Sequence, residues 1–295
     1  MKNMKTILSL LLALLLLAGC GATANQSREE PIPETANQEV AEQATTETTD
    51  ARPDVIVFAA ASLTETLEAI KPVYEQTHNV NLVYSFESSG TLKEQIAQGA
   101  ECDLFISAGQ RQMDQLDAAA DPEVNTEGLD CILSESRGNL LENKVTLCVP
   151  EGNPKGIDSF DKLAEALQQG GILLAMGNSD VPVGQYTQKI LDYYGLDEET
   201  LAQAGEITYG SNVKEVTTWV SEGSVDCGVI YCTDAYSAGL EIVDEATAQM
   251  CGQVIYPAAV VKTGNNRDGA LTFLDYLHTE EAMAVFQEVG FSPVN

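Results

Sequence analysis

The sequence has 295 residues, of which 45 are acidic and 15 are basic, so its formal net charge is −30 at pH 7. So acidic a chain repels a phosphate backbone, and we therefore expect no nucleic-acid partner. The sequence holds two histidines, His78 and His278, and no C-x-x-C motif. These residue types and spacings argue against a zinc or thiol redox site, and we expect no cofactor.

Residues 1–19 have the pattern of a targeting segment. Lys2 and Lys5 precede an apolar stretch at 7–17 that is too short to span a bilayer comfortably. The segment leads into the motif LAGC, which ends at Cys20 and is similar to a bacterial lipobox. We expect residues 1–19 to be a lipoprotein signal peptide and Cys20 to become the lipid-modified N-terminus. The rest of the chain would then lie outside the cytoplasmic membrane, attached to it only through the lipid anchor.

Residues 20–53 are predicted to form a disordered acidic tether. They are rich in Glu, Thr, Ala, Gln and Pro and contain almost no large apolar side chain. Such a segment cannot bury enough apolar surface to offset the loss of chain entropy, and its acidic residues repel one another. We therefore expect the folded part of the chain to begin at Asp54.

The stretch from Val55 to Ile70 predicts a strand, a tight turn and a helix. Val55 to Phe58 form a short apolar run, three alanines follow, and apolar residues then recur at helical spacing after Ser62. Serine is a preferred N-cap residue, so we place Ser62 at the helix N-cap. The start of a helix carries unpaired backbone N–H groups and the positive end of the helix dipole. The stretch is therefore a candidate anion site, although an ordinary capping serine would give the same pattern.

The same arrangement of a strand, a turn and a helix start recurs three times. The three pairs are the strand 81–86 before Ser89, the strand 172–176 before Val183 and Gly184, and the segment 207–212 before Val213. Gly184 permits close approach of the backbone to a ligand. Together with Ser62, these segments predict four helix N-termini with free donors.

The remaining apolar runs complete an alternation of strands and helices. Strands are predicted at 103–107, 144–149, 225–231 and 255–262, and helices at 160–167, 270–277 and 280–289. This alternation predicts α/β domains with mostly parallel sheets. Tyr231 ends its strand, and ligands in open α/β sheets bind beyond the carboxyl ends of the strands.

Six cysteines follow Cys20. Their even number and the expected extracytoplasmic location permit disulfides, but Cys148 and Cys227 lie in apolar runs where buried free thiols are common. The sequence leaves the disulfide state open for Cys102, Cys131, Cys148, Cys227, Cys232 and Cys251.

Seven motifs, taken in order, resemble the periplasmic molybdate-binding proteins of ABC transporters. The resemblance covers nearly all of the chain from Asp54 to Asn295. The motifs are FAAASL at 58–63, SFESSGTL at 85–92, DLFIS at 103–107, VPVG at 181–184, NVK at 212–214, GVIYCTDA at 228–235 and YPAAVV at 256–261.

The resemblance implies a type II periplasmic-binding-protein fold. Two α/β lobes would be joined by a hinge that the chain crosses twice, near 137–144 and near 252–257. The first lobe would hold residues 54–140 plus 256–295, and the second lobe residues 141–255.

The resemblance also implies the residues of the site. In this family a tetrahedral oxyanion lies between the lobes and is held by two serines, two backbone N–H groups and a tyrosine hydroxyl. Motif by motif, these positions fall on Ser62, Ser89, Val183, Val213 and Tyr231.

Two positions depart from the family pattern. Val183 stands where a small residue is frequent, and we expect it to narrow the cleft while keeping its backbone contact. Gly90 replaces a common serine and is expected to loosen the turn beside Ser89. Two carboxylates near the cleft, Glu65 and Glu87, are expected to face solvent.

The chemistry of the ligand agrees with this assignment. Molybdate at neutral pH is a fully deprotonated dianion whose oxygens only accept hydrogen bonds, whereas phosphate keeps a proton that needs an acceptor. The five positions supply donors and no carboxylate, and the helix N-termini add partial positive charge. Tungstate has nearly the same size and charge, so the sequence does not separate it from molybdate.

The expected function is capture of molybdate or tungstate and delivery to an ABC permease driven by a cytoplasmic ATPase. We expect a monomer without catalytic activity. One alternative is a binding protein for another oxyanion, such as sulfate, or for an organic acid. Another is a hydrolase that uses a serine of the cleft, but the sequence has no G-x-S-x-G, H-E-x-x-H or P-loop motif.

Overall fold

The computed structural model describes residues 52–294. The predicted signal peptide, Cys20 and nearly all of the predicted tether lie outside the described residues. Within 52–294, no helix is both long enough and apolar enough to cross a membrane.

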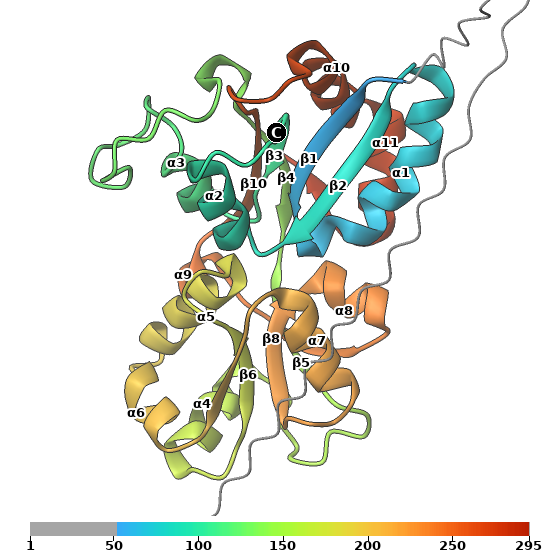
Figure 1. Ribbon diagram of the computed structural model, residues 1–295. Coiled ribbons are helices and arrows are strands. Elements are labelled where there is room, and N and C mark those ends of the chain that lie inside the picture. The colour runs from blue at the N-terminus through green and yellow to red at the C-terminus, as the bar shows by residue number, and fades with distance from the viewer. Residues whose placement is uncertain (1–51, 295) are drawn as a thin grey trace, which may run out of the picture. The chain divides into compact units, whose positions relative to one another are not determined.

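The described chain forms two α/β lobes, each built around one sheet (Figure 1). The first lobe has a six-stranded sheet in the order β11-β4-β10-β3-β1-β2. Its strands are β1 (Asp54–Ala60), β2 (Asn81–Glu87), β3 (Leu104–Ile106), β4 (Gly138–Asn143), β10 (Val254–Val260) and β11 (Ser292–Pro293). The second lobe has a five-stranded sheet in the order β7-β6-β8-β5-β9. Its strands are β5 (Val145–Val149), β6 (Leu174–Gly177), β7 (Ile207–Gly210), β8 (Cys227–Tyr231) and β9 (Glu241–Glu245).

Helices cover both sheets. In the first lobe, α1, α10 and α11 lie on one face of the sheet, and α2 and α3 lie on the other (Figure 1). The helical elements of this lobe are η1 (Ala61–Leu63), α1 (Thr64–Thr77), α2 (Ser89–Ala97), α3 (Gln110–Asp114), η2 (Ser134–Ser136), α10 (Arg267–Leu277) and α11 (Glu280–Glu288). Those of the second lobe are α4 (Phe160–Gln169), α5 (Pro182–Tyr193), α6 (Glu198–Gln203), α7 (Val213–Ser221), α8 (Cys232–Ala238) and α9 (Ala248–Cys251).

The alternating side chains of β1 explain why its sheet is covered on both faces. Val55 and Val57 join the apolar cluster that includes Leu67 of α1. Phe58 points to the other face and packs in a cluster with Leu92 of α2. Successive side chains of a strand point to opposite faces, so the apolar run at 55–58 requires a helix on each side.

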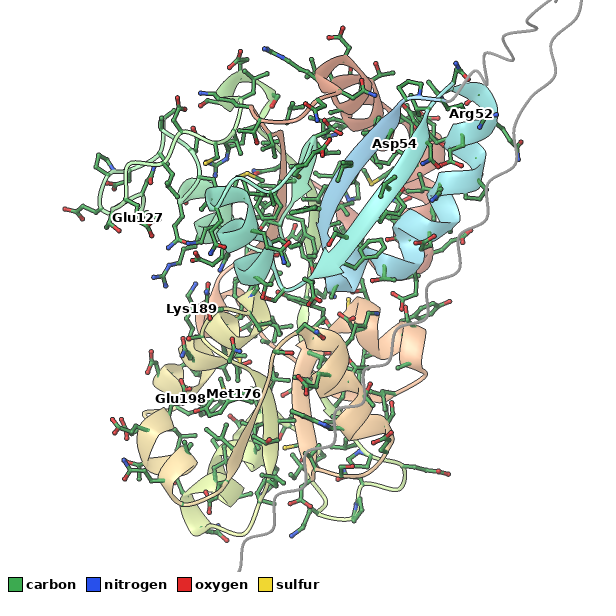
Figure 2. The ribbon with its side chains drawn as sticks, viewed as in Figure 1. Arg52, Asp54, Glu127, Met176, Lys189 and Glu198 are labelled. Carbon is green, nitrogen blue, oxygen red and sulfur yellow. The ribbon has the colours of Figure 1, made fainter. Side chains whose placement is uncertain are left out.

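In the second lobe, Met176 of β6 is buried, whereas Glu127 in the first lobe and Lys189 in the second are exposed (Figure 2).

Both sheets are mixed, which corrects the prediction that they are mostly parallel. In the first lobe, β1 pairs in parallel with β2 and β3, but β10 is antiparallel to β3 and to β4. In the second lobe, β6 pairs in parallel with β7 and β8, but β5 is antiparallel to β8 and β9. The antiparallel strands include the ones that carry the chain between the lobes, since β4 leads directly into β5.

The chain crosses between the two sheets at two places. It leaves the first sheet after Asn143 and enters the second at Val145, and it returns between Cys251 and Val254. The predicted lobe boundaries at 140/141 and 255/256 therefore fall inside β4 and β10. These two strands are hydrogen-bonded neighbours, with Val254 opposite Asn143, so the two crossings lie side by side.

Among the described residues, all six cysteines are free thiols, and Cys148 and Cys227 are fully buried. The apolar runs that carry these two residues are the strands β5 and β8.

Candidate functional site

Most of the predicted site residues meet at a small cavity between the two lobes. The cavity has a volume of about 10 Å³. Four of the five predicted residues, namely Ser62, Ser89, Val213 and Tyr231, line it directly. The full lining is Ala60, Ala61, Ser62, Glu87, Ser88, Ser89 and Ala108 from the first lobe, and Val181, Pro182, Val213 and Tyr231 from the second. Val183 does not line the cavity, but it follows Pro182 in the first turn of α5 and its side chain is fully buried.

Ser62 lies within a 3₁₀ turn, which corrects its predicted place at the helix N-cap. The turn η1 spans Ala61–Leu63, its N-cap is Ala60, and α1 begins only at Thr64. The chain leaves β1 and tightens into 3₁₀ geometry before the α-helix, as is frequent at helix N-termini. The Ser62 hydroxyl therefore caps no backbone N–H. It lies 2.9 Å from the hydroxyl oxygen of Tyr256 instead.

Ser89 is the first residue of α2 and leaves the capping to its neighbour. The Ser88 hydroxyl accepts a hydrogen bond from the Thr91 N–H at 3.1 Å, which is ordinary N-cap geometry. The turn thus has its capping hydrogen bond with glycine at position 90. The Ser89 hydroxyl accepts from the Ala108 N–H at 2.9 Å. Its own hydrogen remains available to a ligand in the cavity.

The second lobe presents two helix starts to the cavity. Helix α5 begins at Pro182, a favoured first helical residue, and α7 begins at Val213 after the capping residue Asn212. The first N–H groups of a helix have no partner within the helix. Gly184 lets α5 pack closely on its own loop, because a Cβ there would lie 2.3 Å from the Gly177 carbonyl oxygen. The close approach predicted at Gly184 is thus made to this loop and positions the helix start.

Tyr231 ends β8 and is 1% exposed. Its hydroxyl lies 3.5 Å from the Ala108 carbonyl oxygen in the first lobe. This distance is long for a hydrogen bond, so the interaction is weak. Burial raises the pKa of Tyr231 well above the ordinary value of 10.0. The phenol therefore keeps its proton and remains a hydrogen-bond donor.

One residue of the cavity lining and two residues behind it went unrecognised in the sequence. Ala108 bridges Ser89 and Tyr231 through its backbone, and it directly follows the strand run that was predicted at 103–107. Tyr256 and Asn143 lie behind Ser62, where the Asn143 amide nitrogen donates to the Tyr256 hydroxyl at 3.1 Å. Tyr256 stands in a recognised motif, but no local pattern pairs it with Ser62.

A lysine bridges the two lobes beside the cavity. The Lys214 ammonium in α7 contacts both carboxylate oxygens of Glu65 in α1, at 2.8 and 2.7 Å. It also lies 3.1 Å from the Asp234 carboxylate in α8. Glu65 is therefore engaged in an ion pair, although about half of its side chain is exposed as expected. Glu87, in contrast, is half-buried and lines the cavity, which corrects the expectation that it faces solvent.

Asp234 is a buried carboxylate with an altered pKa. Burial raises the pKa to about 6, although the Lys214 charge opposes that shift. For Lys214 itself, burial lowers the pKa, but the charges of Asp234 and Glu65 outweigh it and the pKa lies above its ordinary value. The lysine charge is thus matched by two carboxylates and is not directed into the cavity.

The arrangement is suited to holding an anion through neutral donors. The cavity lining contains serine hydroxyls, a tyrosine hydroxyl and helix starts, with Glu87 as its one carboxylate, and it includes no lysine, arginine or histidine. Within residues 52–294, no group of three or more His, Cys, Asp or Glu side chains is placed to hold a metal ion. Helix N-termini with free N–H groups bind oxyanions without a buried cation.

Comparison with known proteins places this chain in a family. Residues 55–292 match the family described as bacterial extracellular solute-binding protein. The protein YvgL of Bacillus subtilis, whose name describes it as a putative ABC transporter substrate-binding lipoprotein, is 33% identical over 99% of this chain and 98% of its own length. The molybdate-binding protein ModA of Escherichia coli is 31% identical over 81% of this chain and 88% of its own.

More distant matches include proteins named for molybdate, for sulfate and for an enzymatic activity. The molybdate-binding protein of Azotobacter vinelandii superposes with a TM-score of 0.69 at 21% identity, covering 82% of this chain and 100% of its own. The sulfate-binding protein SubI of Mycobacterium tuberculosis does so with a TM-score of 0.65 at 18% identity, covering 82% and 88%. An aconitate isomerase of Pseudomonas is 23% identical over 81% of this chain and 87% of its own. The match over residues 55–292, together with the two-lobed fold and the cavity between the lobes, shows that this chain belongs to the bacterial extracellular solute-binding protein family.

Proposed function

We propose that the chain is the substrate-binding lipoprotein of an ABC transporter and that it captures molybdate or tungstate between its lobes. The observation that carries the proposal is the cavity at which Ser62, Ser89, Val213 and Tyr231 meet. These positions are the ones that the molybdate-binding motifs imply. The identity of 31% to the molybdate-binding protein of Escherichia coli over most of both chains adds support.

The donor set favours a small, fully deprotonated oxyanion. The residues carried over from the motifs supply hydroxyl and backbone N–H donors, and an anion that only accepts hydrogen bonds can satisfy all of them. An organic carboxylate is usually held by an arginine fork, and the cavity lining contains no arginine. We also propose binding without catalysis. A catalytic serine needs a neighbouring base, and the cavity lining contains no histidine or cysteine beside its serines.

Calorimetric titration of the purified protein with molybdate, tungstate, sulfate and phosphate tests the ligand. We expect one-to-one binding of molybdate and tungstate, with weak or no binding of sulfate and phosphate. A preference for sulfate would retain the anion cleft but assign the protein to a different transporter. No heat with any of the four anions would refute the proposal.

The proposed location follows from the N-terminal segment. Cys20 would carry the lipid anchor, and the lobes, acting as a monomer, would pass the anion to a membrane permease that a cytoplasmic ATPase drives. Metabolic labelling with a tagged fatty acid tests the anchor, with Cys20→Ser as the matched control. We expect label and membrane retention in the native chain and loss of both in the variant.

A further inference from the structure

A buried chain of hydrogen bonds runs from the crossing between the lobes to Ser62. The Asn143 amide nitrogen lies 3.1 Å from the Tyr256 hydroxyl oxygen, which in turn lies 2.9 Å from the Ser62 hydroxyl oxygen. The three residues are 3%, 0% and 4% exposed, respectively. Each hydrogen in this chain therefore has to be directed to a protein partner or into the cavity.

The orientation of the Asn143 amide is determined by a backbone group. The Asn143 side-chain oxygen accepts from the Lys144 N–H at 2.8 Å, and a backbone N–H can only donate. The Cys232 thiol approaches the same oxygen at 3.2 Å. The amide nitrogen consequently faces the Thr233 hydroxyl at 3.0 Å and the Tyr256 hydroxyl at 3.1 Å, and it donates to both.

This orientation determines where the Tyr256 proton goes. The Tyr256 oxygen accepts from Asn143, so we direct its own hydrogen to Ser62, the other side chain at a hydrogen-bond distance, 2.9 Å. Burial, followed by the Asp234 charge, raises the pKa of Tyr256 well above its ordinary value, so the phenol keeps that hydrogen. The Ser62 oxygen then accepts from Tyr256, and the serine hydrogen is left for an acceptor in the cavity.

We propose that Asn143 and Tyr256 are positioning residues that hold the Ser62 hydroxyl as a donor toward the cavity and thereby select fully deprotonated oxyanions. The inference rests on the proposed function, because it explains how one of the carried-over serines discriminates between anions. A protonated anion such as hydrogen phosphate carries a donor of its own. With the lone pair of Ser62 engaged by Tyr256, the cavity offers that donor one acceptor fewer.

The chain of bonds also depends on the hinge. Asn143 is the last residue of β4, directly before the first crossing, and Thr233 belongs to α8 of the second lobe. Tyr256 lies in β10, just after the second crossing. The Ser62 hydroxyl is therefore oriented by residues that stand at both crossings.

Two substitutions test the direction of the hydrogen bonds from Asn143 through Tyr256 to Ser62. Tyr256→Phe frees the Ser62 lone pair, so the ratio of molybdate to phosphate affinity is expected to fall by about tenfold, the effect of one charge-assisted hydrogen bond. Asn143→Asp replaces the donor by an acceptor. The Tyr256 hydrogen would then be directed to Asp, Ser62 would donate to Tyr256, and molybdate affinity is expected to fall by at least about tenfold.

A double-mutant cycle separates the polarity effect from the added charge. If Asn143→Asp acts through the Tyr256 hydroxyl, it should weaken molybdate binding much less in the Tyr256→Phe background than in the native chain. Tyr186→Phe is the matched control, since Tyr186 is a buried tyrosine whose hydroxyl contacts the Gln253 carbonyl at 3.4 Å and not Ser62. Thermal unfolding of each variant verifies that it folds.

The outcomes separate this inference from the proposed function. An unchanged ratio of molybdate to phosphate affinity in Tyr256→Phe, or additive effects in the double-mutant cycle, would overturn this inference. The proposed function would still stand if the native protein binds molybdate. If the native chain prefers sulfate, the same ratio is measured with sulfate in place of molybdate and is expected to fall in the same way. If the native chain binds none of these anions, both proposals are overturned.

Discussion

A Cβ atom at Gly90 would lie 2.1 Å from the carbonyl oxygen of Asp180. Gly90 belongs to α2 in the first lobe, and Asp180 lies in the loop before α5 in the second. The two backbones therefore meet across the cleft at a distance that leaves no room for a side chain. Glycine at this position lets the two helix starts of the cavity approach each other.

The first prediction concerns this contact. Gly90→Ala should hold the lobes apart and lower oxyanion affinity by at least about tenfold, because the missing approach removes one or more charge-assisted hydrogen bonds. Calorimetry measures the affinity, and small-angle scattering with ligand measures the compaction. Gly138→Ala is the control, since no atom lies within 4 Å of a Cβ there. Native affinity and compaction in Gly90→Ala would contradict the steric argument.

The second prediction concerns the hydroxyl donors of the cavity. Ser62→Ala and Tyr231→Phe should each weaken molybdate binding by about 1.5–3 kcal/mol, the range for a hydrogen bond to a charged group. Ser237→Ala and Tyr236→Phe, at exposed positions of α8, serve as controls and should bind normally. Unchanged calorimetric affinity in both cavity variants would remove these side chains from the site.

The third prediction concerns the lysine bridge. Glu65→Gln should lower the free energy of unfolding by no more than about 1 kcal/mol, because about half of that carboxylate is exposed. Lys214→Met should cost about 3–5 kcal/mol, because it leaves the buried Asp234 without its cation. Urea unfolding measures both values. The double variant Lys214→Met with Asp234→Asn should recover most of the loss, and equal effects of the two single variants would contradict this account.

The fourth prediction is a dependence of stability on pH. The pKa of Asp234 is about 6 in the folded chain, compared with an ordinary value of 3.8. The folded state therefore binds this proton more tightly, and the Asp234 contribution to stability falls as pH rises from about 4 to about 6. A shift of about two pKa units corresponds to about 3 kcal/mol.

Comparison with Asp234→Asn isolates this group. The free energy of unfolding of Asp234→Asn relative to the native chain should be about 3 kcal/mol more favourable at pH 7 than at pH 4. Glu65 and Lys214, which contact each other and face Asp234, are present in both proteins. A difference that stays constant between the two pH values would show that Asp234 does not titrate in this range.

The sequence predicted elements whose signals are local. The four helix starts at Ser62, Ser89, Val183 and Val213 follow apolar runs and turn residues, and they appear within two residues of the predicted positions. The strand β4, with the sequence GNLLEN, was missed because only two of its residues are large and apolar. The strand β9 was missed because an edge strand with the sequence EIVDE is mostly exposed and carries charges.

Contacts between distant segments escaped the sequence for a different reason. Tyr256 meets Ser62 across 194 positions, and Ala108 meets Tyr231 across 123. No period or turn signal encodes such pairs, which arise only when the sheets bring strand ends together. Nothing in the sequence distinguishes Asp234 from the other acidic residues, of which the chain has 45 in all, and its burial is evident only in the packed structure.

The buried strand β10 determines the kind of motion that the lobes can make. All seven of its residues are buried, and it is paired on both sides, with β3 and with β4. The linking segments are consequently short, with Lys144 alone in one and Gly252 and Gln253 in the other. Two short links that are anchored in this way are expected to permit rotation of one lobe relative to the other but little translation. In the proposed binding cycle, each closure of the second lobe would therefore bring the same backbone amides opposite the same serines, so the size and shape of the anion that satisfies these donors would stay constant.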